Sequence, residues 1–328
     1  MIGMRKRVLM VALATAGMTF GYAAPASAQA TRTWVSGTGD DVNPCSRTAP
    51  CKTFAGAISK TAAGGEINCL DPGGYGAVTI IKSMTIDCHY TEGGALAGGN
   101  GITVNMPATT DVTYIRGLDI FGVNPPSNGV RFVNNGTLHI EDSNIRRFNS
   151  VNSFGVSYQP SGASELYIRN TTIAENGNVD GTGGGILIQP TGAGGSGKVE
   201  MTDVRVRNND GVGVKVDTAG NTSLAGTLVS IRESSLSGSP LGVSAIMAAG
   251  GPSVQVTVVN SQVSFNTVAG LASTGSGTAV VRASGNTIFG NQVAVLTSGG
   301  GTVRSYGDNL VDGNNAVSAF SGADLPKD

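Results

Sequence analysis

The chain has 328 residues, of which 40% are hydrophobic and only 13% are charged, and its net charge is −1. A net charge so close to zero argues against the basic face of a nucleic-acid-binding protein, and the recurring Val, Ile and Leu exclude a disordered chain. Gly occurs 50 times without a Gly-X-Y period, which excludes collagen and favours many short strands joined by tight turns.

The first thirty residues have the three parts of a signal peptide. Basic residues 5–7 precede an apolar run over residues 8–24, and small residues near Ala28 and Ala30 offer two cleavage points. We therefore expect residues 1–30 to be removed and the mature protein to be secreted, into the periplasm or the extracellular space. The alternative is a membrane anchor, although the apolar run is short for a bilayer span. No later segment predicts a membrane-spanning helix.

A short strand and a capping helix are predicted next, within residues 31–66. Apolar residues recur on one helical face from Thr53 to Ala62, and Gly64 and Gly65 are expected to end the helix. Such a helix would cover the open apolar end of a stacked structure, which terminal units need for solubility.

Residues 67–328 repeat a pattern of short apolar stretches with a period of roughly 20–33 residues, which is typical of a solenoid. Parallel coils stack about 4.8 Å apart, so equivalent residues should lie in columns. The pattern predicts an all-β, right-handed parallel β-helix of roughly ten coils. One aliphatic residue per coil should form an inward marker column: Ile120, Ile145, Ile173, Val206, Leu236, Val263, Ile288 and Leu310.

Two polar columns accompany the markers. Side-chain amides stacked in this way can hydrogen-bond along the axis and satisfy backbone groups of the turns, so we expect a structural role. Three positions after the markers stand Asn176, Asn209, Asn266 and Asn291, with Ser239 in one coil. Two positions before the markers stand Ser143, Thr171, Ser234 and Ser261, interrupted by Val204.

All four cysteines lie in the N-terminal part, at Cys45, Cys51, Cys69 and Cys88. An even count in an exported chain favours two disulfides over zinc, since there is no Cys-x-x-Cys. Three pairings are possible. If Ile67 stacks on Ile86, Cys69 lies one coil from Cys88, which is within disulfide range. We therefore favour Cys69–Cys88, with Cys45–Cys51 pinning the cap.

The coils and the asparagine column resemble the pectin-lyase-like superfamily of right-handed parallel β-helices. The N-terminal segment adds to the resemblance, because Trp34 to Asp41, Pro50 to Phe54, Ala57-Ile58 and Pro72 to Tyr75 look like the start of many exported bacterial β-helix proteins. The resemblance covers nearly all of the mature chain and is more specific for fold than for activity. It implies enzymes that cleave acidic polysaccharides with acids, or with acids, Ca²⁺ and a basic residue, on one outer face.

The catalytic pattern that this resemblance implies is incomplete. There is no Gly-His-Gly, and the only Asp-Asp lies in the N-terminal segment. The nearest candidate is a column three positions before the markers. Its acids and the basic residues beside it could form a groove for a glycan, or only solvated ion pairs. Asn170 separates two of the acids, which weakens the case for a catalytic carboxylate pair. The candidate site residues are Asp142, Asp203, Glu233, Arg205 and Arg207.

Other site chemistry is sparse. Aromatic residues make up 5% of the chain and look scattered, so we expect no stacking platform from Tyr114, Phe132, Tyr158 and Tyr167. Asp40, Asp41 and Asn43 could hold Ca²⁺ in a loop, although an Asx-turn is the alternative. No other metal or cofactor is indicated.

The first functional hypothesis is a non-catalytic secreted β-helix protein with a structural, adhesive or glycan-binding role. The alternative is a polysaccharide lyase or glycoside hydrolase that acts on an acidic polysaccharide. An ice- or mineral-binding solenoid ranks last, because the outward positions are too mixed for flat threonine ladders. The expected partner is a polysaccharide or a cell-surface glycan, and the sequence leaves both catalysis and oligomeric state open.

Overall fold

The computed structural model describes residues 29–327, apart from residues 124, 276–277 and 317–318. The predicted signal peptide lies almost entirely outside the described residues. Within them, no helix is both long enough and apolar enough to cross a membrane.

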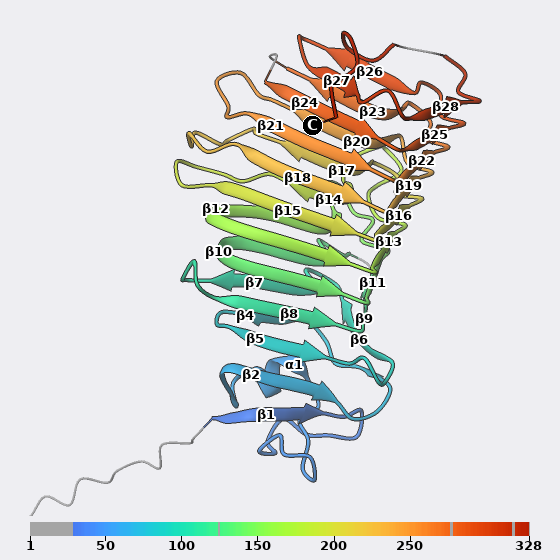
Figure 1. Cartoon of the computed structure of the whole chain (residues 1–328). Coiled ribbons are helices and arrows are strands. Elements are labelled where there is room, and N and C mark those ends of the chain that lie inside the picture. Colours follow the sequence, from blue (N-terminus) through green and yellow to red (C-terminus); the bar gives the residue numbers. More distant parts are fainter. Residues whose placement is uncertain (1–28, 124, 276–277, 317–318, 328) are drawn as a thin grey trace, which may run out of the picture.

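The chain winds into a parallel β-helix whose strands form three long faces (Figure 1), which confirms the predicted fold class. The strands pair in parallel with their equivalents in the neighbouring coils. We call the faces first, second and third, in the order in which a coil passes through them. The first and third faces belong to one 18-stranded sheet, because β10 (Val130–Glu141) and β12 (Phe154–Arg169) run through both, and the second face is a separate 10-stranded sheet.

The first face lies above β1 (Ala30–Val35) and carries the longer strands. These are β2 (Thr61–Cys69), β5 (Met84–Asp87), β8 (Val112–Arg116), the later parts of β10 (Val130–Glu141) and β12 (Phe154–Arg169), β15 (Ser196–Thr202), β18 (Thr227–Arg232), β21 (Val254–Val259), β24 (Ala279–Ser284) and β27 (Thr302–Ser305).

The second face has short strands. These are β3 (Gly73–Gly74), β6 (Gly93–Ala97), β9 (Leu118–Gly122), β11 (Asn144–Arg146), β13 (Thr172–Ala174), β16 (Arg205–Arg207), β19 (Ser235–Ser237), β22 (Gln262–Ser264), β25 (Thr287–Phe289) and β28 (Leu310–Asp312).

The third face completes each coil. Its strands are β4 (Val78–Ile80), β7 (Ile102–Met106), the first parts of β10 and β12, β14 (Gly184–Ile188), β17 (Val212–Asp217), β20 (Leu241–Ile246), β23 (Ala269–Thr274) and β26 (Val295–Ser298).

The N-terminal helix α1 (Phe54–Ile58) is shorter than predicted. Thr53 caps its N-terminus, because the Thr53 side chain accepts a hydrogen bond from the Gly56 backbone, and the helix buries Phe54 against the first coil. The predicted extension to Ala62 is wrong. The chain leaves the helix at Ser59, because Thr61 already pairs with β1, and the two glycines expected as a stop lie inside β2.

The disulfides join Cys45 to Cys51 and Cys69 to Cys88. Ile67 pairs directly with Ile86 in neighbouring coils, so the second disulfide links two stacked strands. The Cα atoms of Cys69 and Cys88 are 5.0 Å apart, a distance that coil stacking alone supplies.

The marker column lies inside the helix, with one correction. The markers from Ile120 to Ile288 are fully or almost fully buried. Leu310, however, is 63% exposed and pairs with Thr287, whereas Val311 pairs with Ile288. The predicted register in the last coil was wrong by one residue, and such a slip moves a side chain to the opposite face of a strand.

Buried amides stack beside this column at the turn between the second and third faces. The Asn266 side chain accepts a hydrogen bond from the Ser239 backbone and donates to the Asn291 side chain and the Leu236 carbonyl. Asn176 and Asn209 repeat the arrangement, and Asn314 extends it to the last coil. The amides therefore satisfy backbone groups that the turns leave unpaired.

Candidate functional site

The predicted acid column lies at the turn between the first and second faces, where every residue has a left-handed backbone. The φ angles are 51° at Asp142, 53° at Asp203 and 51° at Glu233. Gly117 and Gly285 occupy the same turn in other coils, with φ of 65° and 64°. A left-handed backbone is least costly for Gly, Asn and Asp. The acids in this column therefore reflect the backbone conformation of the turn as well as any need for charge.

The structure separates the predicted candidates into two environments. Asp203 pairs with Arg205 at 3.0 Å, and both side chains are about half exposed, so the pair is a solvated surface contact. Asp142 and Arg207 instead border a groove of about 730 Å³ on the second face. Glu233, Asp203 and Arg205 do not line that groove.

The second-face groove crosses several coils and carries both signs of charge. On its wall, Arg146 forms a two-point contact with Asp119 at 2.9 and 2.8 Å. The guanidinium of Arg146 also lies 4.7 Å from the ring centre of Phe121. Arg207 makes no ion pair with the described residues, which leaves its charge available at the rim.

His89 bridges two carboxylates beside the same turn. Its Nδ1 lies 3.0 Å from Asp87 and its Nε2 lies 2.7 Å from Asp142. A side chain at Gly117 would meet the His89 backbone, because its Cβ would lie 2.6 Å from the His89 Cα. The glycine in the intervening coil therefore allows His89 to reach across it.

Both nitrogens of a His89 ring that faces two carboxylates act as donors when the ring is protonated. Burial lowers the pKa of His89, but the hydrogen bonds to Asp142 and Asp87 outweigh it and raise the pKa above its ordinary 6.5. The bond from His89 lowers the pKa of Asp142 below its ordinary 3.8. The cluster is thus a charged cross-link between coils, and its histidine is held rather than free to act as a base.

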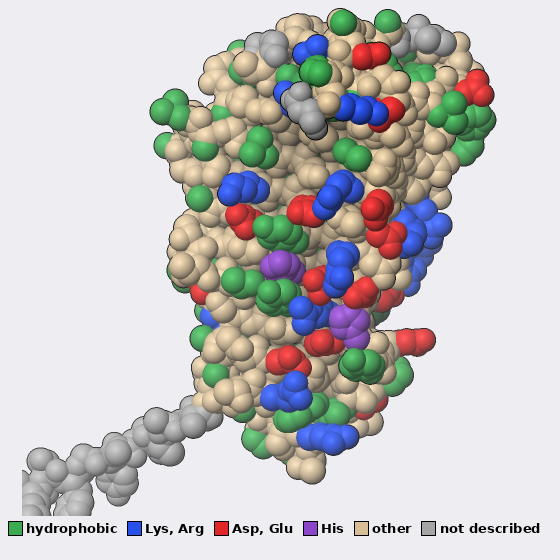
Figure 2. Space-filling model, in the orientation of Figure 1, with side chains coloured by type: hydrophobic (Ala, Val, Ile, Leu, Met, Phe, Trp, Pro, Cys, Tyr) green, Lys and Arg blue, Asp and Glu red, His purple; other side chains and the backbone are tan. Residues whose placement is uncertain are grey.

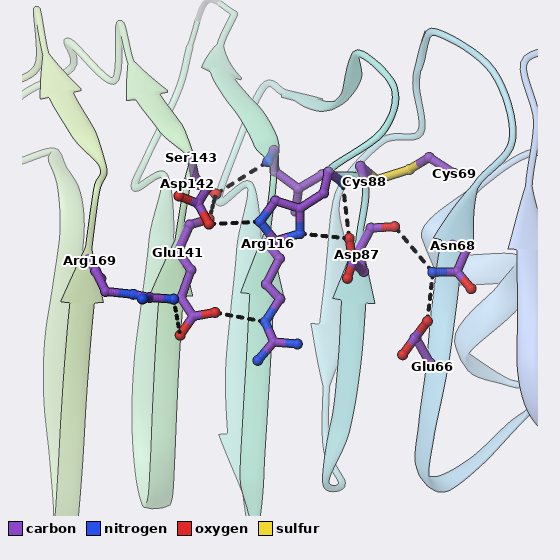
Figure 3. Close-up of polar contacts among 12 residues, drawn as sticks. Glu66, Asn68, Cys69, Asp87, Cys88, Arg116, Glu141, Asp142, Ser143 and Arg169 are labelled. Carbon is purple, nitrogen blue, oxygen red and sulfur yellow. Dashed lines mark hydrogen bonds and ion pairs between the residues drawn. A yellow bond between two sulfur atoms is a disulfide. The ribbon is translucent and has the colours of Figure 1, made fainter.

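Charged side chains form a continuous row on the first face, as Figure 3 shows. Arg116 donates to Glu141 at 2.8 Å, and Arg169 approaches the same carboxylate at 3.6 Å. Glu141 is largely buried beneath its partners, whereas Arg169 is 63% exposed. Figure 2 shows the basic and acidic groups alternating along this face.

An aromatic column lies beside this row, and it corrects our expectation of scattered rings. Tyr114, His139 and Tyr167 pair across three coils and stack nearly parallel, with ring centres 4.4 and 4.8 Å apart. Phe132 and Tyr158 also meet, but inside the core. Burial within the stack lowers the pKa of His139 below its ordinary 6.5, which favours the neutral ring.

The stack ends at a hollow. The Arg116 guanidinium lies 4.4 Å from the ring centre of Tyr114 and covers that end of the stack. At the other end, Tyr167 lines a hollow of about 380 Å³ together with Lys198, Leu228 and the short side chains of Ser230 and Thr257. One aromatic ring therefore stands at the border of an open site.

The carboxylates of Asp40 and Asp41 accept hydrogen bonds from backbone groups of the N-terminal cap. Asp41 accepts hydrogen bonds from the Lys52 and Thr53 backbones, and Asp40 accepts one from the Val42 backbone, as an Asx-turn does. Across the described part of the chain, no three His, Cys, Asp or Glu side chains are grouped to suit a metal ion.

The aromatic column was missed because its three rings lie in separate coils and share no local motif. An alignment of the sequence coil by coil would have placed the three rings in register. Each ring stands two residues before the Arg or Glu that ends its strand. The sequence indicated no role for the two histidines, because Asp142, which His89 contacts, and the tyrosines that stack on His139 come from other coils.

Comparison with known proteins supports the fold. No family model matches the sequence, and no curated protein matches it significantly. Among solved structures, the chain resembles pectate lyase Pel9A, with a TM-score of 0.63 and 14% identity over 89% of this chain and 78% of that chain. It also resembles a rhamnogalacturonan lyase, with a TM-score of 0.54 and 16% identity over 80% of this chain and 75% of that chain. At such identities the likeness shows the fold alone, which is a parallel β-helix.

Proposed function

We propose that this protein is exported and binds an acidic polysaccharide along its first face. The observation that carries the proposal is the ring stack that ends at Tyr167 beside the first-face hollow. An aromatic ring offers a flat apolar surface for the C–H face of a sugar. A volume of about 380 Å³ falls within the usual range of ligand sites.

The charges around the hollow suit a carboxylated sugar. Lys198 is 72% exposed and lies 3.5 Å from Glu165, and Arg232 pairs with Glu200 while half exposed. Exposed pairs of this kind contribute little stability, so a uronate carboxylate can replace the protein carboxylate at small cost. A row of such pairs repeated coil by coil suits a linear polymer.

Export is part of the proposal. The two disulfides agree with an oxidising compartment outside the cytoplasm. The signal peptide over residues 1–30 remains a prediction, and so does the choice between periplasm and extracellular space.

A polysaccharide lyase is the second candidate, at least as well supported as a non-catalytic role, because both structural neighbours are polysaccharide lyases. The second-face groove would hold the substrate, with Arg207 pairing with the uronate carboxylate. A groove carboxylate such as Glu175 would take the proton next to that carboxyl group, since both oxygens of Asp142 are already hydrogen-bonded. The electron pair would then form the double bond as the glycosidic C–O bond breaks, and the leaving oxygen would take a proton from solvent water.

Binding can be tested by affinity electrophoresis in gels that contain polygalacturonate, rhamnogalacturonan or neutral dextran. We expect retardation by the acidic polymers and a loss of about tenfold in affinity for Tyr167→Ala and Lys198→Ala. Arg131→Ala is the matched control, since it removes an exposed cation from the third face. Equal retardation of all variants, or none by either acidic polymer, would reject the first-face site.

Cleavage can be tested by following the ultraviolet absorbance of unsaturated products and the release of reducing ends. Arg207→Ala should abolish any activity of the groove, whereas Arg205→Ala, on the same strand but outside the groove, should retain it. Activity that survives Arg207→Ala would remove the groove from consideration. Binding without any cleavage would leave the first proposal standing alone.

A further inference from the structure

A separate pocket lies on the third face, and its lining differs from that of the charged first face. Loops over residues 149–153 and 176–183 border a pocket of about 520 Å³ above β12, β14 and β17. Its size is that of a ligand site rather than of a packing defect.

The loops that form this pocket are held in place by hydrogen bonds. The Asn152 backbone donates to the Thr182 hydroxyl at 3.2 Å, and that hydroxyl donates to Asp180 at 2.8 Å. The Gly184 backbone donates to the Ser153 carbonyl at 3.0 Å. The pocket is therefore formed in advance, which reduces the entropy cost of binding.

A chain of amides lies along one wall. Ser157 donates to the Gln159 oxygen at 3.2 Å, and the Gln159 nitrogen donates to the Gln189 oxygen at 2.8 Å. Among the described residues, the Gln189 side-chain nitrogen has no acceptor. This chain presents a donor at its end in a fixed orientation, as binding sites for hydroxyl groups require.

The charge of the pocket is balanced within the protein. Lys215 lines the pocket and pairs at 2.9 Å with Asp217, whose side chain is only 9% exposed. The ammonium group keeps hydrogen-bond donors for a ligand, but its charge is already neutralised. A charged ligand would lose hydration here without gaining an unpaired opposite charge.

We propose that this third-face pocket binds an uncharged pyranose residue of a glycan. Phe154 and Leu187 supply the apolar surface for its C–H groups, and Gln189 and Lys215 donate to its hydroxyls. The inference is independent of the first-face site, because the ligand differs in charge and the two sites share no residue.

Saturation-transfer NMR on the full chain tests whether the third-face pocket binds a neutral sugar. The probes are methyl glucoside, methyl galactoside, methyl rhamnoside and galacturonate. We expect transfer to a neutral glycoside that depends on Gln189, whereas transfer to galacturonate should depend on the first-face Tyr167. Gln189→Leu and Lys215→Met should lower the affinity about tenfold. Val212→Trp, which fills the pocket without removing a polar group, should also abolish the signal.

Two controls separate this site from the first face. Gln255→Leu removes an amide from the first-face hollow, and Tyr167→Ala removes its ring, and neither should change the neutral-sugar signal. Circular dichroism confirms that each variant is folded. Transfer to galacturonate alone, no transfer to any neutral glycoside, or native affinity in Gln189→Leu and Val212→Trp would overturn the proposal.

Discussion

The first and third faces are both built from parallel strands stacked coil on coil. Their outward side chains differ, however, in how much they are exposed to water. On the first face, Leu228 is 45% exposed and its charged neighbours pair across coils in solvent. On the third face, the outward side chains of Ser157, Leu187 and Ser244 are almost fully buried. Alternation along a strand determines which side chains point into the β-helix and which point out of it. Whether an outward side chain is exposed to water depends on the length of the loops that cover it.

A matched pair of leucine truncations tests this comparison most strongly. Leu187→Ala on the third face should lower the free energy of unfolding by about 3 kcal/mol, because it removes a side chain that is almost fully buried. Leu228→Ala on the first face should cost less than about 1 kcal/mol, because its side chain already meets water. Denaturant unfolding followed by circular dichroism measures both, and equal losses would contradict the difference between the faces.

The buried amide column joins the second and third faces, and its removal should be the next largest effect. Asn266→Ala leaves the Ser239 N–H and the Leu236 carbonyl without their partners. We expect a loss of about 2 kcal/mol in the free energy of unfolding. Asn144→Ala, an exposed position on the second face, is the control and should be nearly neutral. A similar loss at both positions would argue against a structural amide column.

The turn that precedes the second face offers a stabilising change. Glu233 holds a φ of 51°, and Gly285 occupies the same turn two coils later. Glu233→Gly should therefore raise the free energy of unfolding by about 1 kcal/mol, while Glu233→Ala should give no gain. The thermal midpoint reports the change. A destabilised glycine variant would show that the carboxylate, not the backbone, matters at this turn.

The His89 bridge, at the turn between the first and second faces, predicts a smaller, pH-dependent effect on stability. Because the folded-state pKa of His89 is raised above 6.5, its stabilisation is fully present below pH 6.5 and is lost as the pH rises through the raised value. Asp142 contributes above pH 3.8 and loses its contribution as the pH falls through its lowered pKa. The bridge should be strongest between these limits.

Thermal midpoints measured from about pH 5 to about pH 8 check this prediction. The native protein should lose more stability over this range than His89→Gln, which cannot titrate. Identical pH profiles for the two proteins would show that the bridge contributes nothing.

Several features followed from residue pattern. Short apolar stretches with a coil-length period can bury their side chains only by stacking, so the fold was predictable before any contact was known. The Cys69–Cys88 pair and the asparagine column follow from that stacking, because equivalent residues must lie about 4.8 Å apart. The last coil was misregistered, since Leu310 and Val311 are adjacent aliphatics and pattern alone cannot choose between them.

The candidate sites depended on contacts between coils and on loop paths. Tyr114, His139 and Tyr167 become one stack only when three coils are in register, and His89 reaches Asp142 only because a glycine stands between them. The third-face pocket depends on where two glycine-containing loops settle. Periodicity constrains which side of a strand a residue occupies, but which side chains meet, and which are covered, is a property of the folded coils together.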